Sequence, residues 1–133
     1  MYLENLSSEE KVLFMGVAYH LANIDGDYCI NERNMMQAYC NEMGCEFDLE
    51  KVAPLDDIIK DLAKKADMKT KKIIIFEAIG LAICDNKYDD DERAFIGGMT
   101  KVFNIEPAFV EQSEKVLIEY ISFQSKINNL VIG

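Results

Sequence analysis

The sequence predicts an all-α protein, a compact helical bundle of two pseudo-symmetric three-helix repeats. Apolar residues recur at helical spacing along nearly the whole chain, and no segment alternates polar and apolar residues as a β-strand does. Half of the 133 residues are hydrophobic, and the chain has only seven glycines and two prolines, which is typical of a folded helical protein. A chain of this length buries one core, so we expect a single domain over residues 1–133.

A short phrase that occurs twice, 60 positions apart, predicts the internal repeat. Residues 25–33 read DGDYCINER and residues 85–93 read DNKYDDDER, and both fit the pattern Asp-x-x-Tyr-x-x-x-Glu-Arg. Small apolar residues before the two copies match as well, namely Ala18, Leu21 and Ala22 with Ala78, Leu81 and Ala82. A repeat at a constant offset indicates a duplicated structural unit, with repeat 1 at about residues 7–66 and repeat 2 at about 67–126.

The first repeat begins with two helices whose ends carry clear signals. The first helix starts at Ser7, where Ser7 and Glu10 form a capping box, and ends near Asn23. The second runs from about Ile30 to Met43. Gly44 follows it and suits the left-handed conformation that closes a helix.

The third helix of the first repeat follows Pro54, since proline suits the first turn of a helix. The second repeat has the same plan. Asp67 takes the place of Ser7 as the N-cap. Residues 73–84 then correspond to the first helix, and residues 90–103 correspond to the second.

The last helix starts at Pro107 and extends toward the C-terminus. It carries a wide apolar stripe, and a stripe of this width covers more than one neighbour. The stripe consists of Val116, Leu117, Tyr120, Ile121, Ile127 and Val131, widened by Ile118, Phe123 and Leu130.

The charge balance limits the classes of partner. With 24 acidic and 14 basic residues the net charge is −10, so the surface repels the phosphates of nucleic acids and favours cations or basic peptides. The most apolar run, residues 73–84, is too short to cross a membrane, and the first residues lack the pattern of a signal peptide. Four cysteines without a CxxC pair are typical of reduced thiols. We expect a cytoplasmic protein that is not membrane-embedded and has no nucleic-acid partner.

The two acidic loops of the repeated phrase are the candidate functional site. Carboxylates are hard oxygen ligands of the kind that bind Ca²⁺ or Mg²⁺. The candidate metal ligands are Asp25, Asp27 and Glu32 in the first loop and Asp85, Asp89 and Glu92 in the second. The spacing from the first Asp to the Glu is too short for an EF-hand loop.

A structural interpretation of the same loops stays open beside the metal site. Asp89 lies where the N-cap of the helix over residues 90–103 is expected, and Glu92 three residues on completes a capping box. Tyr88 would fix the loop to the core. In this interpretation the acidic side chains bind backbone N–H groups, and the loops only join helices.

The twin loops, ANIDGDYCINER and AICDNKYDDDER, lie between paired helices and resemble the TerB family of tellurite-resistance proteins and its TerB-like relatives. The resemblance covers about residues 8–119. It implies an all-α fold with two helical repeats, a link to tellurite or stress resistance, and a metal site in the loops. At the matching positions the metal site would use Asp25 and Glu32 in the first copy and Asp85 and Glu92 in the second.

The predicted function is binding without catalysis. We expect a TerB-like module that binds a divalent cation, a protein partner through the acidic face or the C-terminal helix, or both. Two alternatives stay open: a purely structural adaptor whose acidic loops only cap helices, and a hydrolase that uses paired carboxylates. The sequence contains no nucleophile elbow, phosphate loop or zinc-protease motif, which disfavours an enzyme. The oligomeric state does not follow from the sequence.

One long-range contact is predicted from the repeat. Glu77 is the only charge within the apolar run 73–84, and its burial without a partner would be costly. If the helices that contain His20 and Glu77 cross antiparallel at the pseudo-axis, these two side chains meet, and Gly80 lies against Val17. We therefore expect a hydrogen bond between His20 and Glu77.

Overall fold

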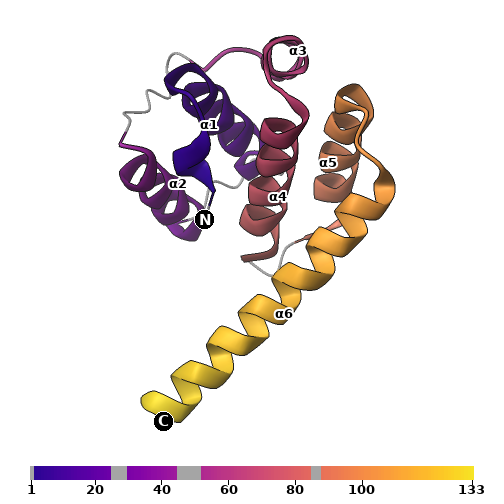
Figure 1. Ribbon diagram of the computed structural model, residues 1–133. Coiled ribbons are helices and arrows are strands. Elements are labelled where there is room, and N and C mark those ends of the chain that lie inside the picture. The colour runs from indigo at the N-terminus through magenta and orange to yellow at the C-terminus, as the bar shows by residue number, and fades with distance from the viewer. Residues whose placement is uncertain (1, 25–29, 45–51, 85–87) are drawn as a thin grey trace.

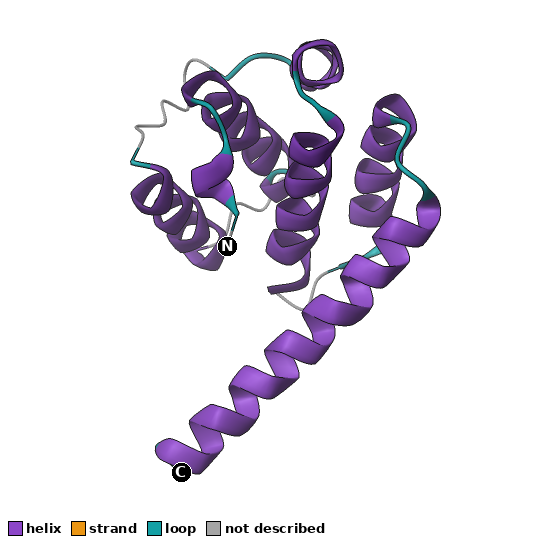
Figure 2. Cartoon of the chain, in the orientation of Figure 1, coloured by secondary structure: helices purple, strands orange, loops and turns teal. Residues whose placement is uncertain are grey.

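A computed structural model of the chain describes residues 2–24, 30–44, 52–84 and 88–133, with the backbone alone for residues 30–33, 35 and 84. The described residues contain no strand and form a short 3₁₀ helix, η1, and six α-helices (Figure 1, Figure 2). The bounds are Leu3–Asn5 for η1, Ser8–Ala22 for α1, Ile30–Met43 for α2, Leu55–Lys65 for α3, Met68–Cys84 for α4, Asp90–Phe103 for α5 and Pro107–Val131 for α6. The predicted all-α class is confirmed.

Two helices, α1 and α4, form the centre of the bundle. α1 packs against α2, α3 and α4, while α4 also packs against α5 and α6. Both helices bury consecutive residues, 14–18 in α1 and 77–79 and 81–83 in α4. A helix buried in this way is surrounded by other elements on most sides. This position explains why residues 73–84 are apolar around nearly the whole helix.

The helix starts follow the capping residues that the sequence predicts. Ser7 Oγ accepts a hydrogen bond from Glu10 N at 3.2 Å, and Glu10 Oε1 accepts one from Ser7 N at 2.8 Å. At the start of α4, Asp67 Oδ1 accepts a hydrogen bond from Thr70 N at 2.8 Å. The predicted capping box at Ser7 and the predicted cap at Asp67 are both confirmed.

The helix boundaries repeat at the offset that the sequence repeat has. α1 and α4 begin at residues 8 and 68, while α2 and α5 occupy residues 30–43 and 90–103. The residue after each of the latter two helices is left-handed: Gly44 has a φ of 64° and Asn104 a φ of 57°. The two halves thus share an order of local structures. The superposition of repeat 1 on repeat 2 about a pseudo-two-fold axis stays a prediction.

The first residues of the chain pack on the middle of the bundle. Leu3 is fully buried, and η1 lies against α2 and α4. Tyr2 N donates a hydrogen bond to Glu77 Oε1 at 2.9 Å. Glu77 is only 7% exposed, so this backbone N–H group satisfies one oxygen of a buried carboxylate.

The predicted hydrogen bond between His20 and Glu77 is wrong. His20 Nε2 is bonded instead to the carbonyl oxygen of Ala53 at 2.8 Å. Gly80 does not face α1 either, because a Cβ atom placed on Gly80 would contact Leu117 of α6 at 3.7 Å. The symmetry argument failed because α6 covers the side of α4 that carries Gly80, and the N-terminal residues cover Glu77.

Helix α6 leaves the bundle after its first turns (Figure 1). Its proximal part packs against α4, where Ser113 and Leu117 are buried. From residue 118 to the C-terminus every residue is exposed. The predicted start of this helix at Pro107 is confirmed, but its wide apolar stripe is covered only in the proximal turns, because the distal turns extend beyond the bundle.

Candidate functional site

The structure describes only part of the predicted cation site. The residues Asp25, Asp27 and Asp85 lie outside the described residues, as does the side chain of Glu32. A metal site shared by the two loops requires the carboxylates of Asp25, Glu32, Asp85 and Glu92 to converge on one point, and this convergence stays a prediction. In the part of the chain that the structure describes, no three His, Cys, Asp or Glu side chains are grouped so that they could hold a metal ion.

Asp89 is the N-cap of α5. Its Oδ1 accepts a hydrogen bond from Glu92 N at 3.0 Å, and its backbone is extended, as an N-cap requires. Asp90, Asp91 and Glu92 follow in the first turn, where the helix dipole favours negative charge. The predicted capping role of Asp89 is confirmed, so one oxygen of this candidate ligand is bound to the helix backbone.

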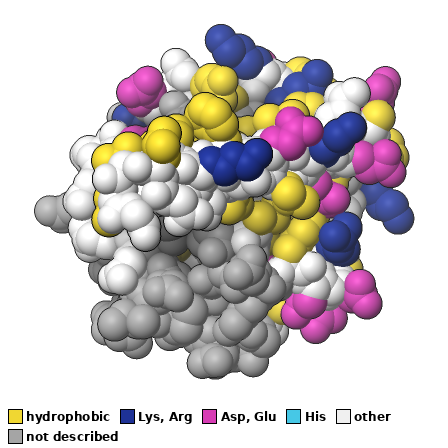
Figure 3. Space-filling model, turned by 90° about the horizontal axis from the view of Figure 1, so that it is seen from below, with side chains coloured by type: hydrophobic (Ala, Val, Ile, Leu, Met, Phe, Trp, Pro, Cys, Tyr) yellow, Lys and Arg dark blue, Asp and Glu magenta, His cyan; other side chains and the backbone are white. Residues whose placement is uncertain are grey.

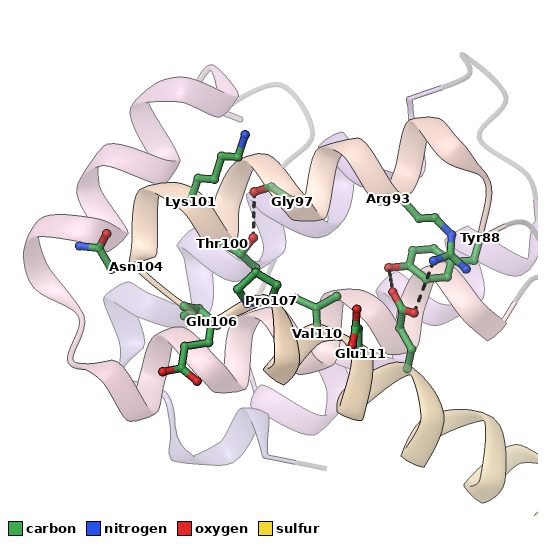
Figure 4. A pocket seen from close by; sticks show the side chains of 12 residues that line it. Tyr88, Arg93, Gly97, Thr100, Lys101, Asn104, Glu106, Pro107, Val110 and Glu111 are labelled. Atoms are coloured by element: carbon green, nitrogen blue, oxygen red, sulfur yellow. Dashed lines mark hydrogen bonds and ion pairs between the residues drawn. The ribbon is translucent and has the colours of Figure 1, made fainter.

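Tyr88, Arg93 and Glu114 form a cluster that joins α6 to the start of α5 (Figure 4). The Tyr88 hydroxyl donates a hydrogen bond to Glu114 Oε1 at 2.6 Å, and Arg93 Nη1 lies 3.4 Å from Glu114 Oε2. The guanidinium carbon of Arg93 lies 4.4 Å from the centre of the Tyr88 ring, which is the geometry of a cation–π contact. We name these three residues the Tyr88 cluster.

The residues that the repeated phrase contributes to the Tyr88 cluster come from its second copy. Tyr88 and Arg93 belong to the second copy of the phrase, and a shift of 60 residues places Pro54 at the position of Glu114. The first copy therefore has no carboxylate at the equivalent position. The sequence predicts Tyr88 as an anchor of the loop, and Tyr88 does pack against the core. It does not predict Glu114, whose role depends on where α6 lies.

The surroundings of Tyr88 keep its phenol protonated. Burial raises the pKa of Tyr88, and the hydrogen bond to Glu114 raises it further, because an ionised phenol would face a second negative charge. Arg93 lowers the pKa of Tyr88, but by less. The phenol is therefore a hydrogen-bond donor at neutral pH.

Two hollows border α6. A groove of about 670 Å³ runs between α5 and α6 beside the Tyr88 cluster, and charges of both signs line it (Figure 4). They come from Arg93, Lys101, Glu106, Glu111 and Glu114. A smaller cavity of about 380 Å³ lies where α2, α4 and α6 meet, lined mainly by aromatic and aliphatic side chains. Mixed charge in the groove gives neither cations nor anions a clear preference.

Apolar side chains reach the surface in the distal half of α6. Seen from below, the surface carries hydrophobic side chains between charged ones (Figure 3). On α6 the large exposed hydrophobic residues are Val116, Ile118, Tyr120, Ile121, Phe123, Ile127, Leu130 and Val131. Among the helices that the structure describes, none has the length and apolar character needed to cross a membrane.

The fold and these surfaces define an architectural class, an all-α bundle whose C-terminal helix projects from it. In comparisons with known proteins, the chain matches no protein-family model, no curated protein and no solved structure. Evidence for the function therefore comes from the geometry of the described residues.

Proposed function

We propose that this protein is a non-catalytic, TerB-like helical module that acts by binding a protein partner through α6. The observation that carries this proposal is the distal half of α6, which projects from the bundle with apolar side chains in water (Figure 1). Phe123 is 62% exposed and Leu130 is 85% exposed. A contiguous exposed apolar surface on a folded protein marks an interaction site. The link to tellurite or stress resistance rests on the resemblance of the loops and belongs to the same proposal.

The Tyr88 cluster supports binding over catalysis. Both carboxylate oxygens of Glu114 are engaged, and Tyr88 keeps its proton because its pKa is raised. A general acid or base needs a group that exchanges a proton near the working pH. The cluster instead fastens α6 to the start of α5, and it thereby fixes the direction in which α6 leaves the bundle.

A charge placed on the exposed apolar face tests the proposal. Phe123→Glu puts a carboxylate into this face, so we expect the tagged full-length protein to lose its cross-linked partner in cells. Helix content and melting temperature should stay unchanged, because Phe123 is exposed. Ser125→Glu is the matched control, since residue 125 is also exposed and lies nearly opposite Phe123 around the helix. Equal cross-linking by both variants would contradict binding through α6.

A second function, binding of a divalent cation by the twin acidic loops, is supported by the repeated local structure. The caps at Ser7 and Asp67 correspond, as do the left-handed residues Gly44 and Asn104. The two loops join α1 to α2 and α4 to α5, and these helix pairs carry matching signals at their ends. We propose Ca²⁺ or Mg²⁺ as the ligand, because carboxylates are hard oxygen ligands.

Calorimetric titration of the full chain with Ca²⁺, Mg²⁺ and Mn²⁺ tests the cation site. We expect the bound cation to raise the melting temperature, and the double variant Asp25→Asn, Asp85→Asn to lose this rise. The double variant Asp56→Asn, Asp57→Asn removes the same charge from the first turn of α3, and the cation should still raise its melting temperature. No heat of binding and no change in melting temperature would leave only the capping interpretation.

A further inference from the structure

The exposed apolar residues of α6 follow a heptad pattern. Val116, Tyr120, Phe123, Ile127 and Leu130 are separated by alternate steps of four and three residues. Their exposed fractions lie between 42% for Tyr120 and 85% for Leu130. Such steps place side chains along one side of a helix, as in the contact line of a coiled coil. We name these five residues the α6 seam.

We propose that the α6 seam binds the α6 seam of a second copy of this chain, in an antiparallel two-stranded coiled coil. This inference rests on the proposed function, in which α6 is the binding element, and it names the partner. With the two-fold axis between them, Tyr120 of each copy packs against Phe123 of the other, and Val116 packs against Ile127. The same surface then serves both copies, as in any closed two-fold dimer.

The charges beside the seam fit a second copy in the antiparallel direction. Glu119 and Lys126 are seven residues apart, so they occupy the same heptad position on one side of the seam. In an antiparallel pair this position faces its counterpart, which brings Glu119 of each copy beside Lys126 of the other. In a parallel pair the two residues would face Gln124 and Val131 instead, without any charge complementarity.

Both charges are available for such pairing. Glu119 and Lys126 are exposed, and neither side chain makes a hydrogen bond or an ion pair with another described residue. Leu117 is 5% exposed and contacts the α4 side of the bundle at Gly80. Because successive residues of an α-helix are turned by about 100°, Val116 points away from the buried side of α6 that carries Leu117, and it is 53% exposed.

The composition of the distal half disfavours a lipid surface as the occupant. A helix that lies in a membrane interface carries several lysines or arginines on its polar face. Residues 118–133 contain one lysine and one glutamate, with serine, glutamine and asparagine at most other polar positions. With a single lysine this stretch lacks such a basic face, so a protein helix suits the seam better than a lipid surface.

Sedimentation equilibrium of the purified full-length chain over a concentration series tests for the second copy. We expect the average mass to rise from 15.2 kDa toward twice that value as the concentration increases. Phe123→Glu should stay at 15.2 kDa, while Ser125→Glu should dimerise like the unchanged protein. Circular dichroism should show equal helix content and melting temperature for Phe123→Glu in dilute solution, which separates loss of pairing from loss of folding.

Charge reversal tests the antiparallel direction. Glu119→Lys alone and Lys126→Glu alone each bring like charges together, so we expect the dissociation constant to rise roughly tenfold. The double variant Glu119→Lys, Lys126→Glu restores both opposite-charge pairs and should restore the original dissociation constant. A dimer that is insensitive to these changes would overturn the antiparallel arrangement.

The outcomes separate this inference from the proposed function. A protein that is monomeric at every concentration, yet cross-links to a different protein in a Phe123-dependent way, overturns the inference and leaves the proposed function in place. A monomer without Phe123-dependent cross-linking overturns both. A dimer that survives Phe123→Glu has its interface elsewhere and overturns the inference.

Discussion

Tyr88 combines three contacts in one half-buried side chain. Its ring packs against the core, its hydroxyl donates to Glu114, and Arg93 covers one face of the ring. The hydrogen bond has an ionised acceptor, and such bonds are short and stronger than neutral ones. A single atom, the phenol oxygen, therefore connects the start of α5 to α6.

We expect Tyr88→Phe to lower the free energy of unfolding by about 1 kcal/mol at neutral pH, because Glu114 Oε1 loses its hydrogen bond. The free energy of unfolding of the variant should also fall less steeply as the pH rises into the alkaline range. The folded protein keeps the Tyr88 proton above pH 10.0, the ordinary pKa of the group, whereas the unfolded chain ionises there. The stability contribution of Tyr88 is thus present below pH 10.0 and falls as the pH rises toward the raised pKa.

Urea titrations at several pH values measure this difference. Tyr2→Phe is the control, since the Tyr2 hydroxyl has no hydrogen bond to any described residue. A Tyr88→Phe protein with the stability and alkaline profile of the Tyr2→Phe protein would show that the Tyr88 hydroxyl contributes nothing to folding.

Single helices begin and end where local signals place them. Ser7 with Glu10, Asp67 with Thr70, and Gly44 each lie within one turn of the helix end that they define. A cap depends on neighbours in the sequence, so the sequence predicts it well. The capping role of Asp89 in the candidate site could be predicted for the same reason.

Contacts between helices could not be predicted in the same way. Helical spacing indicates which residues are buried but does not tell which helix covers them. Glu77 therefore accepts a hydrogen bond from the backbone of Tyr2, 75 residues away, and Gly80 lies against Leu117 of α6. Glu114 in the Tyr88 cluster was missed for this reason too. The convergence of the acidic loops also depends on long-range packing, and it stays a prediction.

We expect Asp67→Ala to lower the melting temperature at neutral pH, because α4 loses its N-cap. The hydrogen bond from Thr70 N lowers the pKa of Asp67 below its ordinary value of 3.8. The contribution of the charged cap is therefore present above pH 3.8 and is lost as the pH falls through the lowered pKa. Melting temperatures of the two proteins should converge in acid.

Asp67→Ser is the control for this prediction. Serine caps a helix about as well as aspartate but carries no charge. At neutral pH the melting temperature of the Asp67→Ser protein should lie close to that of the unchanged protein. Its melting temperature should lack the fall in acid that the titration of Asp67 causes. A constant gap between Asp67→Ala and the unchanged protein down to the lowest pH would contradict the role of the charged cap.

In the molecule as a whole, the bundle contains the buried core, whereas the end of α6 is exposed. The core is complete without residues 123–133, all of which are exposed. We expect a chain that ends at Ser122 to keep the melting temperature of the dilute full-length protein and to lose its concentration-dependent mass. Leu117→Ala is the contrasting variant, since it removes a buried side chain from the contact with α4 and should cost about 3 kcal/mol. A bundle that melts early without residues 123–133 would contradict this division.

Helix α6 also joins two stretches of different local stability in one continuous backbone. The turns around Leu117 are held by α4, whereas the later turns have only their own hydrogen bonds, and a lone helix of this length is marginal in water. In the monomer, amide hydrogens beyond Leu117 should exchange with solvent far faster than those of α1 and α4. Pairing would then order these turns as it buries the seam, so affinity includes the free energy of helix formation. Ser125→Ala, a change that touches no seam residue, should tighten the dimer and slow amide exchange toward Leu130, because alanine favours the helix by about 0.5 kcal/mol per copy.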